Sequence, residues 1–264
     1  MFEYPNAKNF RYGNKHLKFL KLMTVQAEFP YSETTKSIND TNFYFKWQRH
    51  EGIIDFCDLD DLYLDSDLPI FKAHYSKYID YPNNIFPLGP MCGGRVPTSN
   101  NIHYLFSHEY QYNPQRGFSN KQIPWGHAIR RRNYVKSLFT KTNYSVDQKI
   151  EDSPLKFWRA NQNVLGAICV PGRVNNMLDR GQLELMLLGV CTISPELPEL
   201  LLGKELLPGV HYIKCKDDYS DLLDIMEELT PDKAKEIGNC AKTLKINYHP
   251  IYFMQWITNN VVKR

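Results

Sequence analysis

The stretch VLGAICVPGRVNNMLDRGQLELMLLGVCTIS, residues 164–194, decides the fold. It opens with an apolar run of strand length at 164–170, passes through a Pro-Gly turn into a helix, and ends in a second strand at 189–194. This order predicts two parallel strands joined by a crossover helix. Strands and helices also alternate on both sides of it, so the chain from about residue 100 onward predicts an α/β domain.

The surrounding sequence supplies the remaining expected elements. Strands are expected at residues 43–47, 52–57, 68–75, 102–108, 144–150 and 209–215. Helices are expected at residues 127–139, 153–163 and 218–229, then from the cap Thr230 onward, and lastly through the aromatic stretch YFMQWI. Residues 81–101 are rich in Pro, Gly and Asn, which is typical of a linker. We therefore expect an N-terminal lobe, 1–98, and a C-terminal lobe, 99–264.

The composition narrows the class of protein. The chain has 264 residues, 42% of them hydrophobic and 23% charged, which is typical of a globular protein with a proper core. A net charge of +3 without a concentrated basic stripe argues against a nucleic-acid partner. No apolar window is long enough to predict a membrane span. The six cysteines form no CxxC pair, so no zinc site is expected.

The turn after residues 164–170 is the first candidate site. In open α/β sheets, ligands bind at the carboxyl ends of strands, beside helix N-termini whose N–H groups favour phosphate. This turn and the start of its helix carry Gly172, Arg173, Asn176 and Arg180. Neither GxxxxGKS/T nor GxGxxG occurs in the stretch, so it predicts an anion site that is not a Walker loop or a dinucleotide fingerprint.

One carboxylate, Glu184, stands in an otherwise apolar helical run from Leu183 to Leu188. An unpaired buried carboxylate is costly, so it needs an explanation. Arg180 precedes it at the i, i+4 spacing, and an internal ion pair is therefore one explanation. The other is a binding role, in which the carboxylate accepts ribose hydroxyls as acidic residues do at other nucleotide sites.

The densest basic run of the chain is Arg130-Arg131-Arg132, inside the expected helix 127–139. A helical projection puts Arg132 within the apolar stripe, Arg131 at its edge and Arg130 on the opposite face. A solvated face explains Arg130. Arg132 needs a buried anion or carboxylate, and arginine is suited to bidentate phosphate recognition.

Acidic residues gather directly after the expected strand 52–57. The Asp58-Leu59-Asp60 sequence can place two carboxylates on one divalent metal that holds a diphosphate. Alternatively, one aspartate at the strand end is a general base. An acidic surface loop is the third explanation, and for any single aspartate it is the simplest one.

Two stretches of the second half resemble the C-terminal lobe of GT-B glycosyltransferases. They are CVPGRVNNMLDRGQLELMLLGVCTISPE, 169–196, and LLPGVHYIKCKDDYSDLLDIMEEL, 206–229. In pattern they are most similar to the CAP10-like family 90 of xylosyl- and glucosyltransferases, and RRNYVKSL followed by YSVD also resembles that lobe. The resemblance covers roughly residues 100–250. The compact chain is also similar to glycosyltransferases of large algal DNA viruses, which implies a cytoplasmic location.

The resemblance implies a GT-B-like α/β fold of two Rossmann-like lobes with a cleft between them. It implies inverting transfer of a sugar, with xylose the best guess, from a UDP-sugar to a glycan hydroxyl without a metal. The diphosphate would be neutralised by Arg131 or Arg132, Arg173 and Arg180, and the ribose would lie near Glu184. The first lobe would supply the base, for which we choose Asp58 by its position after 52–57, with Asp80 in reserve.

Two alternatives stay open. The Asp58-Leu59-Asp60 sequence also resembles the metal-binding DxD of GT-A glycosyltransferases. That alternative would place the donor in the first half of the chain and make Mn²⁺ essential. The second alternative is a non-catalytic protein that keeps the fold, binds a sugar or nucleotide, and lacks the base.

Overall fold

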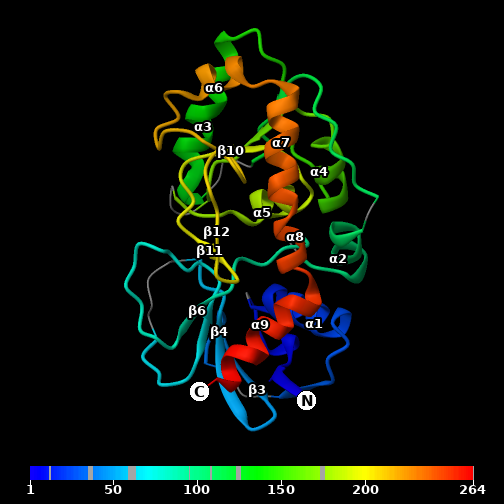
Figure 1. Ribbon diagram of the computed structural model, residues 1–264, viewed down its shortest axis with the longest axis vertical. Coiled ribbons are helices and arrows are strands. Elements are labelled where there is room, and N and C mark those ends of the chain that lie inside the picture. Colours follow the sequence, from blue (N-terminus) through cyan, green and yellow to red (C-terminus); the bar gives the residue numbers. More distant parts are fainter. Residues whose placement is uncertain are drawn as a thin grey trace. The chain divides into compact units, whose positions relative to one another are not determined.

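The computed structural model of the chain describes residues 1–264 except 12, 35–37, 59–63, 95, 108, 123–125, 173–175 and 264. The chain divides into two compact units (Figure 1). Unit 1 contains Met1–Ile102, Glu199–Glu205 and Ile246–Arg264, and unit 2 contains His103–Pro198 and Leu206–Lys245. The last helix of the chain therefore belongs to unit 1.

Five described strands of unit 2 form one sheet in which every neighbouring pair is parallel. In spatial order they are β13 (Ile213–Lys214), β10 (Thr192–Ser194), β9 (Gly166–Ile168), β7 (Phe118–Ser119) and β8 (Val146–Asp147). The principal helices of this unit are α3 (Ile129–Leu138), α4 (Pro154–Ala160), α5 (Arg180–Leu187), α6 (Leu222–Glu228) and α7 (Pro231–Lys242). Short 3₁₀ helices, η2 (Gly126–Ala128) and η3 (Phe139–Lys141), flank α3. The predicted α/β fold is confirmed.

Alternation along the strands separates the two faces of this sheet. Phe118 and Ile193 point into a core that also contains Val135 of α3 and residues of α6 and α7. Ser119 and Ser194 point the other way, where they bond with Asn161 at the end of α4 and Gln182 of α5. Figure 1 shows α3 and α4 on opposite sides of β10. Helices therefore cover both faces, which leaves the strand ends as the place where side chains of both layers meet.

Unit 1 contains a mixed sheet of six described strands. In spatial order they are β2 (Tyr31–Thr34), β1 (Phe2–Pro5), β3 (Asn42–Trp47), β4 (His50–Asp55), β5 (Ile70–Lys72) and β6 (Ile85–Pro87). Neighbouring strands are parallel from β4 to β6, and β3 is antiparallel to both of its neighbours. The strands β11 (Leu200–Leu201) and β12 (Lys204–Glu205) form a separate hairpin.

The helices α1 (Asn14–Gln26) and α9 (Pro250–Val262) lie against each other, and α9 also contacts β4. The 3₁₀ helix η1 (Ala7–Asn9) precedes α1, and α2 (Ser99–Phe106) and α8 (Leu244–Asn247) lie at the borders of the units.

The helix starts follow from local sequence. Ser153 Oγ accepts a hydrogen bond from the Lys156 amide at the start of α4, and Thr230 Oγ1 does the same for Lys233 at the start of α7. Both helices carry proline in the first turn, where its missing N–H costs nothing. These two predicted starts are confirmed. The run from Leu183 to Leu188 is buried throughout, as its composition predicts.

Two predictions about the middle of the chain are wrong. Residues 102–108 were expected to be a strand, but α2 occupies Ser99–Phe106 because Ile102 and Leu105 are buried at helical spacing and Thr98 caps the Asn101 amide. Residues 81–101 were expected to be a linker, but they contain strand β6 and a largely buried segment after it. The glycines there serve turns inside unit 1, such as Gly89 with φ +99.

Position 238 of α7 requires glycine because the backbone of Gly189 lies too close to leave room for a side chain. A Cβ at this position would lie 2.0 Å from the carbonyl oxygen of Gly189, which itself has φ +83. Because the obstacle is backbone, no side-chain rotation can relieve the clash. We expect Gly238→Ala to destabilise unit 2 by about 1–3 kcal/mol, as overpacking does, although alanine normally favours a helix by about 1 kcal/mol.

Thermal or urea unfolding measures this effect. The exposed Lys235→Ala in the same helix is the matched control and should change the melting temperature little. A Gly238→Ala variant that is as stable as the wild type would contradict the close approach.

Candidate functional site

The carboxyl ends of β7, β9 and β10 form the candidate site of unit 2. Parallel strands present their carboxyl ends at one edge of a sheet, which is where ligands bind in open α/β folds. The strand β9 leads through Val170 and Pro171 into the predicted turn, and α5 begins at Arg180 with Asp179 as its cap. The geometry of this edge depends on how the turn is held.

Arg132 of α3 holds the end of β9. Its Nε and Nη2 donate to the Val170 carbonyl at 3.1 and 2.9 Å, and Nη2 lies 3.4 Å from Asp179 Oδ2. Asp179 Oδ1 accepts from the Gly181 amide at 2.8 Å and so caps α5. One guanidinium therefore joins a strand end to a helix start. Burial lowers the pKa of Arg132, and the Asp179 carboxylate acts in the opposite direction. Arginine stays charged even so.

Arg131 holds the next carbonyl. Its Nη2 donates to the Pro171 oxygen at 3.1 Å, and its Nε is buried without a hydrogen-bond partner in the part of the chain that the structure describes. Arg132 is buried, Arg131 is half-buried and Arg130 is exposed, as the helical projection predicts. Two consecutive arginines thus lie against two consecutive carbonyls.

Three further residues at this edge were missed by the sequence analysis. Gln122 Oε1 accepts from the Val170 amide at 2.7 Å, and the Tyr219 hydroxyl donates to the Cys169 carbonyl at 3.3 Å. Tyr219 has φ +60, which is unusual for a residue with a side chain, and burial raises its pKa. Asn120, directly after β7, is fully buried, and neither atom of its side-chain amide has a hydrogen-bond partner among the described residues. A motif search finds none of them, because each contact joins segments distant in sequence.

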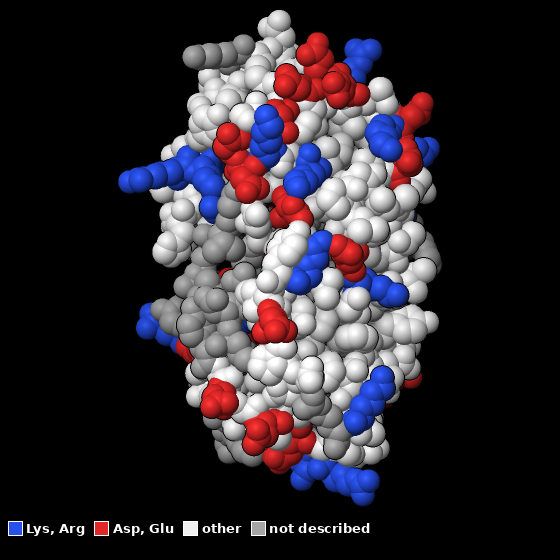
Figure 2. Space-filling model, turned by 60° about the vertical axis from the view of Figure 1, so that its left-hand side comes forward, with Lys and Arg blue, Asp and Glu red and all other residues white. Residues whose placement is uncertain are grey.

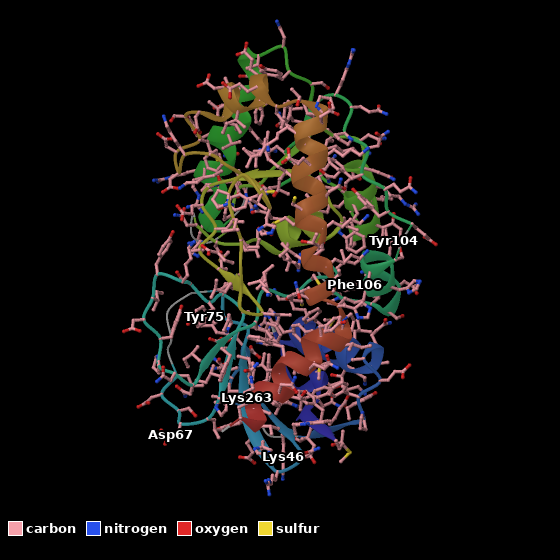
Figure 3. The ribbon with its side chains drawn as sticks, viewed as in Figure 1. Lys46, Asp67, Tyr75, Tyr104, Phe106 and Lys263 are labelled. Carbon is pink, nitrogen blue, oxygen red and sulfur yellow. The ribbon has the colours of Figure 1, made fainter. Side chains whose placement is uncertain are left out.

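Glu184 is paired inside unit 2. Its Oε2 accepts from the Trp158 indole at 2.8 Å, and its Oε1 lies 3.7 Å from Arg180 Nε. The internal ion pair weighed in the sequence analysis is therefore present, together with an indole partner that it missed. Trp158 is stacked at 5.6 Å on Tyr104 of α2, which is labelled in Figure 3. A ribose hydroxyl would have to share this carboxylate with Trp158 and Arg180.

The other predicted residues of the turn are less informative. Gly172 is half-buried, and a Cβ there would lie 3.7 Å from Arg132 Nη2, which is an ordinary contact. Asn176 is exposed. Arg173 lies outside the described residues, so its predicted role stays a prediction. Arg180 is partly exposed and opens α5 beside this turn.

The predicted bases lie in unit 1. Asp58 follows β4 and is exposed, and Asp80 is exposed in the loop before β6. Leu59 and Asp60 of the DxD-like sequence lie outside the described residues. In the part of the chain that is described, no three His, Cys, Asp or Glu side chains are grouped to hold a metal ion.

Unit 1 also contains two buried pairs of ionisable side chains that the sequence analysis missed. Lys72 Nζ lies 2.9 Å from Asp55 Oδ2, and His74 Nδ1 lies 3.6 Å from Glu199 Oε1. Asp55 and Lys72 end the neighbouring parallel strands β4 and β5. Glu199 is distant from His74 in the sequence, so no local sequence pattern predicts the His74–Glu199 pair.

Comparison with known proteins gives no assignment. No model of a protein family matches the chain, and no curated protein matches it. The likeness to family 90 therefore depends on the residues quoted above. Within the described residues, no helix is both long enough and apolar enough to cross a membrane. On the face shown in Figure 2, basic and acidic side chains are interspersed.

The two contacts of Asp179 can be separated by substitution. Asp179→Ala removes both the helix cap and the carboxylate near Arg132, and loss of a cap costs about 0.5–2 kcal/mol. Asp179→Asn keeps a capping oxygen and removes only the charge. We expect both variants to unfold at lower urea concentration than the wild type, and Asp179→Ala at the lowest. Equal losses in the two would show that the cap contributes nothing, against the geometry.

Proposed function

We propose that the β9–α5 turn of unit 2 binds the diphosphate of a nucleotide sugar and that the protein is an inverting glycosyltransferase. The observation that carries the proposal is the pair Arg131 and Arg132 on consecutive carbonyls at the carboxyl end of β9. The resemblance to family 90 supports the same proposed function. The donor is proposed to be a UDP-sugar, with xylose the best guess, and the acceptor a glycan hydroxyl.

The arginines have different parts in this proposal. Arg132 is buried and donates to a backbone carbonyl, so it shapes the turn. Arg131 and Arg180 are partly exposed. These two can reach a phosphate, and Arg173 joins them by its place in the sequence. A guanidinium fixed before the reaction stabilises the charge that develops on the leaving diphosphate.

The reaction would be a single displacement. A base removes the proton of the acceptor hydroxyl while that oxygen forms a bond to the anomeric carbon of the sugar. The bond from the anomeric carbon to the phosphate oxygen breaks on the opposite face, and UDP leaves with both electrons. No metal is required, because arginines neutralise the diphosphate. The resemblance to enzymes of large algal DNA viruses supports a cytoplasmic location.

We expect UDP to bind in the presence of EDTA and Arg131→Ala to weaken that binding at least tenfold. The loss follows because a hydrogen bond to a charged group contributes about 1.5–3 kcal/mol and about 1.4 kcal/mol is a factor of ten. Calorimetric titration measures it. Arg130→Ala removes the exposed neighbour on the same helix and is the matched control.

The outcomes of this titration separate the competing readings. Loss of all UDP affinity under chelation would favour the metal-dependent alternative that uses Asp58-Leu59-Asp60. Equal affinities in wild type and Arg131→Ala would contradict the proposed site. Tight binding with no donor hydrolysis and no transfer would favour a non-catalytic binding protein.

The sequence-derived base can be tested in the same assays. Asp58→Asn cannot accept a proton, so transfer should fall by about 10²–10⁴-fold, while UDP affinity should survive because the proposed donor site lies in unit 2. Asp80→Asn, exposed in the same unit, is the matched comparison. Normal turnover in the first variant with collapse in the second would reassign the role to Asp80. Normal turnover in both would exclude these two aspartates.

A further inference from the structure

Gln122 of unit 2 closes the end of strand β9 with its side chain. Its Oε1 accepts a hydrogen bond from the Val170 amide at 2.7 Å. Ser119 is the last residue of β7 and is paired with Ala167 of β9, so Val170 lies beyond the last β7 pair. A buried main-chain N–H needs an acceptor, and Val170 is fully buried. The Gln122 side chain therefore supplies the acceptor that a longer neighbouring strand would supply.

The carbonyl groups of the same segment are also held by side chains. The Tyr219 hydroxyl donates to the Cys169 carbonyl at 3.3 Å. Arg132 and Arg131 donate to the next two carbonyls along the chain. Backbone carbonyls are among the groups that bind hard cations, and these three already have donors on them. The occupied carbonyls and the two guanidinium groups therefore favour an anion over a cation at this edge of the sheet.

The amide of Gln122 has a second group, the NH₂ of Nε2, which carries two donors. Because the amide is planar, the bond from the Val170 N–H to Oε1 also restricts the direction of Nε2. Gln122 is half-buried, so its side chain is in part open to solvent. Within the part of the chain that the structure describes, Nε2 donates to no other residue. A donor that is already oriented loses little freedom when a ligand binds it.

We infer that Gln122 Nε2 donates a hydrogen bond to the diphosphate of the sugar donor, an inference that rests on the proposed function. The amide adds no charge to the site. It adds a donor of fixed direction beside the turn whose carbonyls Arg131 and Arg132 hold. Such a donor also stabilises the charge that develops on the diphosphate as the bond to the sugar breaks. Gln122 therefore has two roles, one toward the Val170 amide through Oε1 and one toward the ligand through Nε2.

Two substitutions separate these roles. Gln122→Glu keeps an oxygen for the Val170 amide and replaces the donor with a charged acceptor, whereas Gln122→Met removes both. We expect Gln122→Glu to have a melting temperature closer to that of the wild type than Gln122→Met has. We also expect Gln122→Glu to bind UDP the more weakly of the two, and at least tenfold more weakly than the wild type, because repulsion is added to the lost hydrogen bond. Thermal unfolding and calorimetric titration in EDTA measure the two quantities.

Two further titrations assign the contact to the diphosphate. Inorganic pyrophosphate, which lacks the nucleoside, should also bind Gln122→Glu at least tenfold more weakly than the wild type. The ratio of wild-type to Gln122→Glu affinity for UDP should shrink as the pH falls from about 7 to about 5, because the introduced carboxyl, of ordinary pKa about 4.3 and raised by the anion, takes up a proton and becomes a donor. Gln115→Glu adds the same charge at an exposed position before β7 and should bind UDP like the wild type.

Each other outcome counts against the inference. A UDP affinity of Gln122→Glu within about threefold of the wild type overturns it. It is also overturned if Gln122→Met is the weaker variant in both stability and UDP affinity, since Gln122 would then serve the backbone alone. Weaker UDP binding with unchanged pyrophosphate binding would assign Gln122 to the nucleoside and contradict the diphosphate contact. A wild-type protein that binds neither UDP nor pyrophosphate would instead contradict the proposed function, and this inference with it.

Discussion

Arg132 reaches from α3 to the end of β9, donates twice to the Val170 carbonyl, and lies beside the Asp179 carboxylate that caps α5. A buried guanidinium is tolerated only where such partners compensate its lost hydration. Because three elements meet at this one group, the direction in which β9 leaves the sheet and the position at which α5 begins are both fixed by it. The exposed part of Arg131 and the start of α5 at Arg180 follow from that arrangement, and the proposed anion site is made from them.

The buried polar and charged side chains of this protein differ in whether their polar atoms have hydrogen-bond or ion-pair partners. Arg132, Glu184 and Lys72 each have close partners, which identifies them as parts of the fold. Arg131 Nε, the side-chain amide of Asn120 and His74 Nδ1 are buried without hydrogen-bond partners among the described residues, and an unsatisfied polar atom costs about 1–3 kcal/mol. These atoms lie near the carboxyl ends of parallel strands, the edge at which open α/β folds bind ligands.

Local sequence predicted the features that depend on local physics. The caps Ser153 and Thr230 follow from short-range hydrogen bonding, and the burial order of Arg130, Arg131 and Arg132 follows from helical geometry. The apolar run at 102–108 was misread because a short apolar segment fits a helix as well as a strand. The Pro- and Gly-rich residues 81–101 were misread because the same residues that form linkers also form tight internal turns.

The rest of the candidate site depends on contacts that cross the chain. The i, i+4 spacing of Arg180 and Glu184 predicted their ion pair. Nothing in the sequence predicts the hydrogen bond from the Trp158 indole to Glu184. His74 and Glu199 meet only because the hairpin β11–β12 is part of unit 1, and Gln122 meets Val170 only because β7 lies beside β9. The topology of the fold determines side-chain partners of this kind. They cannot be predicted from the local pattern of a single sequence.

The most direct test of the central claim, that the end of β9 binds a diphosphate, is a crystal structure of the protein with UDP and EDTA. We expect the diphosphate within hydrogen-bond distance of Arg131 and of the turn that follows Pro171, with the Arg132–Val170 contact unchanged. A diphosphate bound away from this turn, or a saturated protein in which Arg131 makes no contact with UDP, would contradict the account.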